Sequence, residues 1–128
     1  MATDHAPHPV EAKETEWSEA AFGMTGLETA LRVVQQAMVD TGLLDWPGVA
    51  DRMSVRPARI GRLTGQGASL AVGGPANLTL YDPAAPAGAV TPGASKSRNT
   101  PFAGMELPGR VVATFLRGVP TVLDGKLA

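Results

Sequence analysis

The sequence predicts a mixed α/β chain in two parts, with helices before about residue 66 and strands after it. Three observations lead to this prediction. Apolar side chains recur at helical spacing between residues 27 and 41. The 15 glycines and 11 prolines concentrate after residue 61. Alternating apolar residues at 78–81 and 110–123 are typical of strands. This order of elements suits the end of one domain followed by part of another.

The first part begins with a polar, acidic stretch at 9–21, which indicates a surface loop with a short helical turn and Trp17 as its one anchor. Thr25 and Glu28 have the spacing of a capping box, in which each side chain bonds the other residue's backbone. They predict the start of a helix that ends at Gly42. Its apolar face consists of Leu27, Leu31, Val34 and Met38.

A second helical region follows, with Asp45 as the predicted N-cap and Pro47 in the first turn. We expect residues 54–57 to break this helix and Pro57 to start another, which ends at Gly65. A helix-turn-helix that binds DNA is an alternative interpretation. The absence of a turn glycine and the net charge of −1 argue against it. Its arginines would be Arg56, Arg59 and Arg62.

The second part is predicted to hold a short strand at 70–72, a strand at 78–81 and a flexible loop at 83–94. A hairpin should join 110–116 to 119–123 through a turn at 117–118, with another turn at 124–125. The polar stretch 95–102 allows two interpretations. It is either a ligand loop or a turn that Phe102 holds against a core.

Composition excludes several classes of function. A net charge of −1 with 18% charged residues gives no electrostatic footprint for nucleic acid or an anionic membrane. The chain has no cysteine, so disulfides and thiolate metal sites are excluded. No apolar run approaches the roughly 20 residues of a membrane helix. Nothing after Met1 resembles a signal peptide.

The first eight residues hold both histidines, His5 and His8, together with Asp4. Carboxylate and imidazole suit zinc, but a structural zinc site needs four ligands and no further histidine exists. The cluster is therefore either part of a larger metal or substrate site or a weakly metal-binding tail. Phe22 and Gly23 precede a helix, where free backbone N–H groups suit a carboxylate or phosphate. A plain helix start with a hydrophobic staple is the alternative there.

Six segments resemble a known family in the same order. Residues 2–8 (ATDHAPH) resemble the end of the eighth barrel strand in class I dihydroorotases of the amidohydrolase superfamily. The others are similar to the family's glycine-rich loop and helix, its S-x-x-P-A-x-I helix, its A-D-L-x-x-x-D strand and its S-x-N-T-P-F-x-G loop. These are residues 22–31, 54–60, 76–82 and 97–104, and residues 109–118 resemble its hairpin. Hydantoinases and allantoinases share the later segments, so the TDHAPH string favours dihydroorotase.

The resemblance implies a fold and an activity. Residues 1–66 would be the last strand and helix portion of a (β/α)8 TIM barrel. Residues 67–128 would be the C-terminal part of a small composite β-sandwich domain. The implied activity is that of a zinc-dependent cyclic amidohydrolase of cytoplasmic pyrimidine biosynthesis. It interconverts N-carbamoyl-L-aspartate and (S)-dihydroorotate, which are small-molecule substrates. A homo-oligomer of the parent enzyme is left open.

The resemblance also assigns roles to residues. Asp4 would touch zinc and act as general base or acid, and His8 would bind the carboxylate side of the substrate. Phe22 and Gly23 would contact the substrate through their backbone. The family's other zinc ligands lie upstream of the eighth strand, so we expect a C-terminal fragment that is inactive alone, from a truncated gene or a late start. The alternatives are an inactive remnant or partner-binding module and, less favoured, a hydantoinase or allantoinase.

Overall fold

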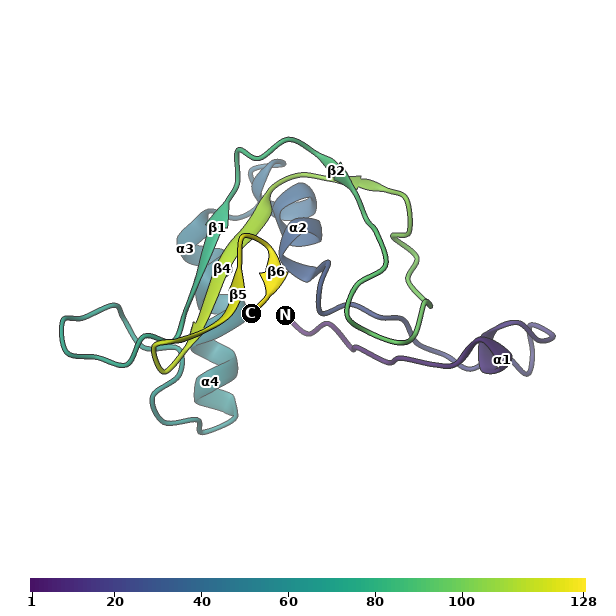
Figure 1. Ribbon diagram of the computed structural model, residues 1–128, viewed down its shortest axis with the longest axis horizontal. Coiled ribbons are helices and arrows are strands. Elements are labelled where there is room, and N and C mark those ends of the chain that lie inside the picture. Colours follow the sequence, from purple (N-terminus) through teal and green to yellow (C-terminus); the bar gives the residue numbers. More distant parts are fainter.

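The computed structural model describes residues 1–128 and has a mixed α/β architecture (Figure 1). A four-stranded antiparallel sheet in the order β1-β4-β5-β6 lies beside the helices, and β2 pairs with β3. The helical elements are α1 (Val10–Lys13), α2 (Ala30–Val34), the π-helix η1 (Gln35–Val39), α3 (Trp46–Ala50), the π-helix η2 (Asp51–Val55) and α4 (Arg56–Ile60). The strands are β1 (Leu78–Asp82), β2 (Gly88–Ala89), β3 (Glu106–Leu107), β4 (Arg110–Leu116), β5 (Val119–Leu123) and β6 (Lys126–Leu127).

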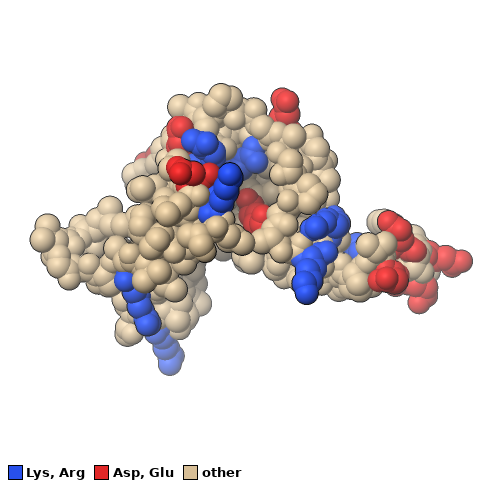
Figure 2. All heavy atoms as spheres, in the orientation of Figure 1, with Lys and Arg blue, Asp and Glu red and all other residues tan.

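The segment around α1 projects from the rest of the chain, at the right of Figure 1. Figure 2 shows acidic side chains gathered on this projection, where the sequence places Glu11, Glu14, Glu16 and Glu19. The predicted surface loop with a helical turn is therefore confirmed. Trp17 is 94% exposed, so its expected role as an anchor within this chain is wrong.

The first helical run, α2 with η1, confirms the helix expected from the apolar spacing, and Gly42 follows it with φ +76°. The predicted capping box is wrong. The helix begins at Ala30, and its N-cap Thr29 makes no side-chain capping bond. The carboxylate of Glu28 accepts instead from the backbone N–H of Ala94, at 2.9 Å. A tertiary contact has replaced the local one that the spacing allowed.

The second helical run confirms Asp45 as an N-cap, because its carboxylate accepts from the N–H of Gly48 at 2.8 Å. The predicted break near Pro57 is wrong, since α3, η2 and α4 follow one another without a gap. A proline in an α-helix lacks an N–H and its ring clashes with the carbonyl four residues earlier. The wider π turn that ends at Val55 gives that ring room. One continuous run also excludes the helix-turn-helix interpretation.

The sheet forms where alternation predicted it. The hairpin from β4 to β5 turns at Arg117 and Gly118, which both have positive φ (51° and 82°). Asp124 and Gly125 repeat this geometry between β5 and β6. Two positive φ values in a two-residue turn match the right-handed twist of the flanking strands. The predicted hairpin and its second turn are confirmed.

Two predictions for the second part are wrong. Residues 70–72 form no strand, and Leu70 and Val72 are exposed side chains in a loop. The expected loop at 83–94 contains β2, whose Gly88 pairs with Leu107 of β3. The apolar residues at 70–72 did not suffice to form a strand, because a strand also needs a neighbouring strand to which it can hydrogen-bond.

The buried core is small, and its apolar members come from the helices (Val49 of α3 and Ala58 of α4) and from the strands. Leu107 is fully buried, and Ala113 of β4 is 5% exposed. Beside them, the hydroxyl of Tyr81 donates to the side-chain oxygen of Gln35 at 2.6 Å, and the ring of Tyr81 lies 5.5 Å from that of Trp46. These contacts join β1 to the helices. No helix of the chain is long and apolar enough to cross a bilayer.

Candidate functional site

Two segments that flank α1 in the sequence run side by side and carry all the predicted site residues. His5 forms a parallel bridge with Met24, and the N–H of Ala6 donates to the carbonyl of Met24 at 2.8 Å. We call residues 4–8 and 22–26 together the site wall. The pairing brings Asp4 and His8 next to the segment of Phe22 and Gly23.

Asp4 has an unusual backbone and an available side chain. Its φ of +47° lies in the left-handed region, which few residues other than glycine adopt without cost. Its carboxylate is exposed and makes no hydrogen bond or ion pair within the chain. Backbone strain of this kind concentrates at functional sites. The carboxylate is therefore free to bind a metal ion or move a proton.

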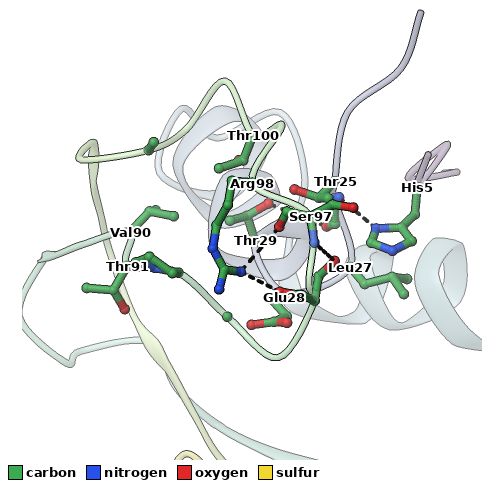
Figure 3. A pocket seen from close by; sticks show the side chains of 15 residues that line it. His5, Thr25, Leu27, Glu28, Thr29, Val90, Thr91, Ser97, Arg98 and Thr100 are labelled. Carbon is green, nitrogen blue, oxygen red and sulfur yellow. Dashed lines mark hydrogen bonds between the residues drawn. The ribbon is translucent and has the colours of Figure 1, made fainter. Parts of the chain in front are cut away.

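His5 fastens the two segments of the site wall together. Its Nδ1 accepts from the backbone N–H of Gly26 at 3.0 Å, which leaves the ring proton on Nε2 (Figure 3). The hypothesis that His5 joins Asp4 and His8 as metal ligands is thus not supported. No three histidine, aspartate or glutamate side chains lie close enough together to hold a metal ion. A metal on Asp4 would need ligands from outside this chain.

Gly23 lies against the first segment so closely that no side chain fits. Its φ is +116°, and a Cβ there would stand 2.5 Å from the Cβ of Ala6 and 3.3 Å from Nε2 of His8. Its N–H makes no hydrogen bond within the chain, so it can donate to a ligand. The neighbouring Phe22 side chain is 95% exposed. The arrangement offers an imidazole and a backbone donor side by side, which suits an anionic group.

Two residues that the sequence interpretation missed hold the site wall in place. The ammonium of Lys13 donates to the carbonyls of Ala21 (2.7 Å) and Gly23 (3.2 Å). The side-chain amide of Asn99 accepts from the N–H of His8 at 3.2 Å and donates to Ala6 (2.9 Å) and Gly23 (3.3 Å). Asn99 lies 91 residues from His8, and no spacing rule connects them. Its place in the 97–104 motif was the available signal.

A polar pocket of about 180 Å³ adjoins the His5 side of the site wall (Figure 3). It lies between residues 25–29 and the loop 90–103, so the ligand-loop interpretation of residues 95–102 has a matching cavity. Its charged groups are already used, however. Glu28 accepts from Ala94, and the guanidinium of Arg98 donates to the carbonyls of Ser95 and Ser97. The bond from Ala94 to Glu28 closes the loop against the residues just before α2, and the bonds of Arg98 lie within the loop.

Comparison with known proteins identifies close relatives. No protein-family model matches the chain. The chain is 65% identical to the dihydroorotase of Streptomyces coelicolor over 129 aligned residues. The alignment covers 99% of this chain and 30% of that protein. It is 54% identical to the dihydroorotase of Mycobacterium tuberculosis, with the same coverage of each chain. The chain thus spans about 30% of the length of these relatives.

Solved structures agree on the fold. The L-hydantoinase (dihydropyrimidinase) of Arthrobacter aurescens superposes with a TM-score of 0.81 at 32% identity, over 98% of this chain and 29% of that one. The D-hydantoinase (dihydropyrimidinase) of a Thermus species gives the same TM-score at 27% identity, over 98% of this chain and 28% of that one. The arrangement of elements described above therefore recurs within larger enzymes.

Proposed function

We propose that this chain, which belongs by sequence to the dihydroorotase family, supplies one wall of a zinc-dependent cyclic amidohydrolase. The reaction is the interconversion of N-carbamoyl-L-aspartate and dihydroorotate in cytoplasmic pyrimidine biosynthesis. One observation carries the proposal. The parallel pairing at His5 and Met24 gathers Asp4, His8, Phe22 and Gly23, the residues to which the family resemblance assigns chemistry.

The free carboxylate of Asp4 fits a role in proton transfer. Closing dihydroorotate from N-carbamoyl-L-aspartate joins the carbamoyl nitrogen to a carboxyl carbon with loss of water, and opening the ring adds water to the same carbonyl. Either direction requires a group that takes a proton and later returns it. Asp4 makes no competing hydrogen bond, so its carboxylate can hold that proton at either oxygen.

His8 and Gly23 fit the recognition of substrate. Both dihydroorotate and N-carbamoyl-L-aspartate carry a carboxylate that takes no part in ring closure. The imidazole of His8 and the unengaged N–H of Gly23 are neighbouring donors for it. The backbone of Phe22 would also contact the substrate carboxylate. Its ring is exposed and would face the part of the enzyme that packs against the site wall.

The site wall could supply only some of the ligands of a zinc ion. Asp4 is the one oxygen ligand we assign, and the remaining ligands would come from outside this chain. When bound, zinc would polarise the substrate carbonyl and lower the pKa of a bound water.

The apolar surface supports a larger assembly. Only 8 of the 128 residues are buried, while apolar side chains on the helices and beside them stay open, among them Ile60 of α4 (82% exposed) and Leu27 just before α2 (64%). Exposed apolar surface of this extent normally belongs to an interface. We assign residues 1–66 to the end of a (β/α)8 barrel and residues 67–128 to a composite β-sandwich. The missing barrel strands would cover the helix faces.

The test is a chimera in which this chain replaces the matching segment of the Streptomyces coelicolor dihydroorotase. We expect it to bind zinc and hydrolyse dihydroorotate, and we expect the 128-residue chain alone to be inactive. A folded, zinc-loaded chimera without turnover would contradict the proposal and favour an inactive remnant. Turnover of hydantoin in place of dihydroorotate would favour the hydantoinase alternative.

A further inference from the structure

We infer that Asn99 is a positioning residue for substrate binding, because its side-chain amide bonds the backbone of both segments of the site wall. The inference rests on the proposed function, since it concerns the same substrate site. It concerns a residue of the C-terminal half of the chain, far in sequence from the groups it would serve.

The hydrogen bonds of Asn99 define the geometry of the wall from both sides. Its Oδ1 accepts from the N–H of His8, and its Nδ2 donates to the carbonyls of Ala6 and Gly23. Its own carbonyl accepts from the N–H of Thr25 at 3.0 Å. One residue is thus bonded to both segments, and every bond ends on backbone.

These bonds act on the groups that would touch the substrate. The bond to the N–H of His8 places the Cα from which the imidazole projects. The carbonyl of Gly23 accepts from both Asn99 and Lys13. These two bonds fix the position of Gly23, whose own N–H is the donor proposed for the substrate. Because two donors meet on this one carbonyl, the loop is held rigidly against Ala6. A displacement of about 1 Å in such groups is enough to weaken binding markedly.

The matched control lies in the same chain. Asn77 makes the same kind of bridge, accepting from the N–H of Arg117 at 2.6 Å and donating to the carbonyl of Gly65 at 2.6 Å. It joins the loop after α4 to the turn between β4 and β5, and it makes no hydrogen bond to the site wall. Asn77→Ala therefore removes comparable bonds without changing His8 or Gly23.

The experiment compares Asn99→Ala, Asn99→Asp and Asn77→Ala in the chimera, with zinc content, thermal melting, KM and kcat for dihydroorotate measured on each. We expect both Asn99 variants to raise KM about tenfold, to change kcat by less than about threefold and to keep the zinc. Asn99→Asp keeps the size of the side chain and the oxygen that accepts from the N–H of His8, but it loses both donated hydrogen bonds. It therefore tests the positioning role even if the alanine variant folds poorly. Asn77→Ala should lower the melting temperature with KM unchanged.

The outcomes separate this inference from the proposed function. An unaltered chimera that folds but lacks activity would overturn the proposed function and this inference with it. An active chimera in which both Asn99 variants behave as Asn77→Ala does would overturn the role of Asn99 alone. A KM increase confined to the Asn99 variants supports it.

Discussion

The sheet and the site wall are held together in different ways. In the sheet, β4 is bonded to β1 on one side and β5 on the other by ladders of backbone hydrogen bonds. In the site wall, the direct backbone bond between the segments runs from Ala6 to Met24, and the side chains of His5 and Asn99 supply the other links, while Lys13 holds the second segment against α1. A ladder survives the loss of one side chain, whereas the wall depends on each of its few. We therefore expect the wall to be more sensitive than the sheet ladders to the loss of a single hydrogen-bonding side chain.

The largest expected effect is that of Asp4→Asn on catalysis. In the chimera, kcat should fall on the order of 100- to 10,000-fold, because the amide cannot carry the proton. Stability should change by less than about 0.5 kcal/mol, since the side chain is exposed and unbonded. Steady-state kinetics and thermal melting check both. Glu14→Gln, on the exposed segment near α1, is the matched carboxylate control. Activity of Asp4→Asn within threefold of the unaltered chimera would remove Asp4 from the proton transfer.

The second effect concerns the buried core, to which Leu107 of β3 belongs. Leu107→Ala empties a fully buried position, so the free energy of unfolding should fall by about 2–5 kcal/mol. Urea unfolding of the chain, followed by circular dichroism, measures it. Leu123→Ala, at a position that is 45% exposed in β5, is the control and should cost much less. Equal losses in the two variants would mean that Leu107 does not form the core we describe.

Gly23→Ala tests how tightly the two segments of the wall are packed. The new methyl group combines a left-handed φ, which costs about 1 kcal/mol, with a collision against Ala6 that adds about 1–3 kcal/mol. Gly104→Ala isolates the first cost, because Gly104 has φ +74° and nothing within 4 Å of its Cβ position. The difference in unfolding free energy between the two variants is the packing contribution. If the two variants lose the same amount, the wall is looser than the structure indicates.

The same contrast explains what the sequence could predict. Strand alternation and glycine at position 118 of a two-residue turn are local signals, so the hairpin was predicted to the residue. The helix after residue 27 was predicted from periodicity, but its start was not, because Glu28 bonds a loop 66 residues away. Pro57 wrongly predicted a break in the helix. The π turn that accommodates the proline ring has no recognisable sequence pattern, so it could not be predicted.

The candidate site divides in the same way. Its four residues were found through family resemblance to strings of adjacent letters, and the structure places them side by side. Asn99 and Lys13 were missed as site residues because their partners are backbone atoms, which have no residue type to recognise. When a side chain bonds the backbone, the residue type of its partner is not constrained, so the sequence contains no matching residue to look for. Sequence reasoning on one chain therefore finds reactive groups more readily than the residues that position them.

The smallest effect probes the junction between the sheet and the helices through pH. Burial raises the pKa of Tyr81 above its usual 10.0, Asp40 and Asp82 raise it further, and Arg32 opposes them. Because the fold favours the protonated phenol, this contribution to stability is complete below pH 10 and is lost as pH rises through the folded pKa. Tyr81→Phe should cost about 1 kcal/mol near neutral pH, through the lost bond to Gln35. It should also flatten the decline in stability above pH 10.

Tyr81 is the only tyrosine in the chain, so no other phenol contributes to that difference. All other charged side chains are common to both proteins, so their contributions cancel when the two curves are subtracted. Urea unfolding at pH 7 to 11 gives both curves. Parallel curves would mean that the phenol is as well solvated in the folded chain as in the unfolded one. The junction between β1 and η1 would then be open to water, and the sheet would be held by its backbone ladders with little help from the helices beside it.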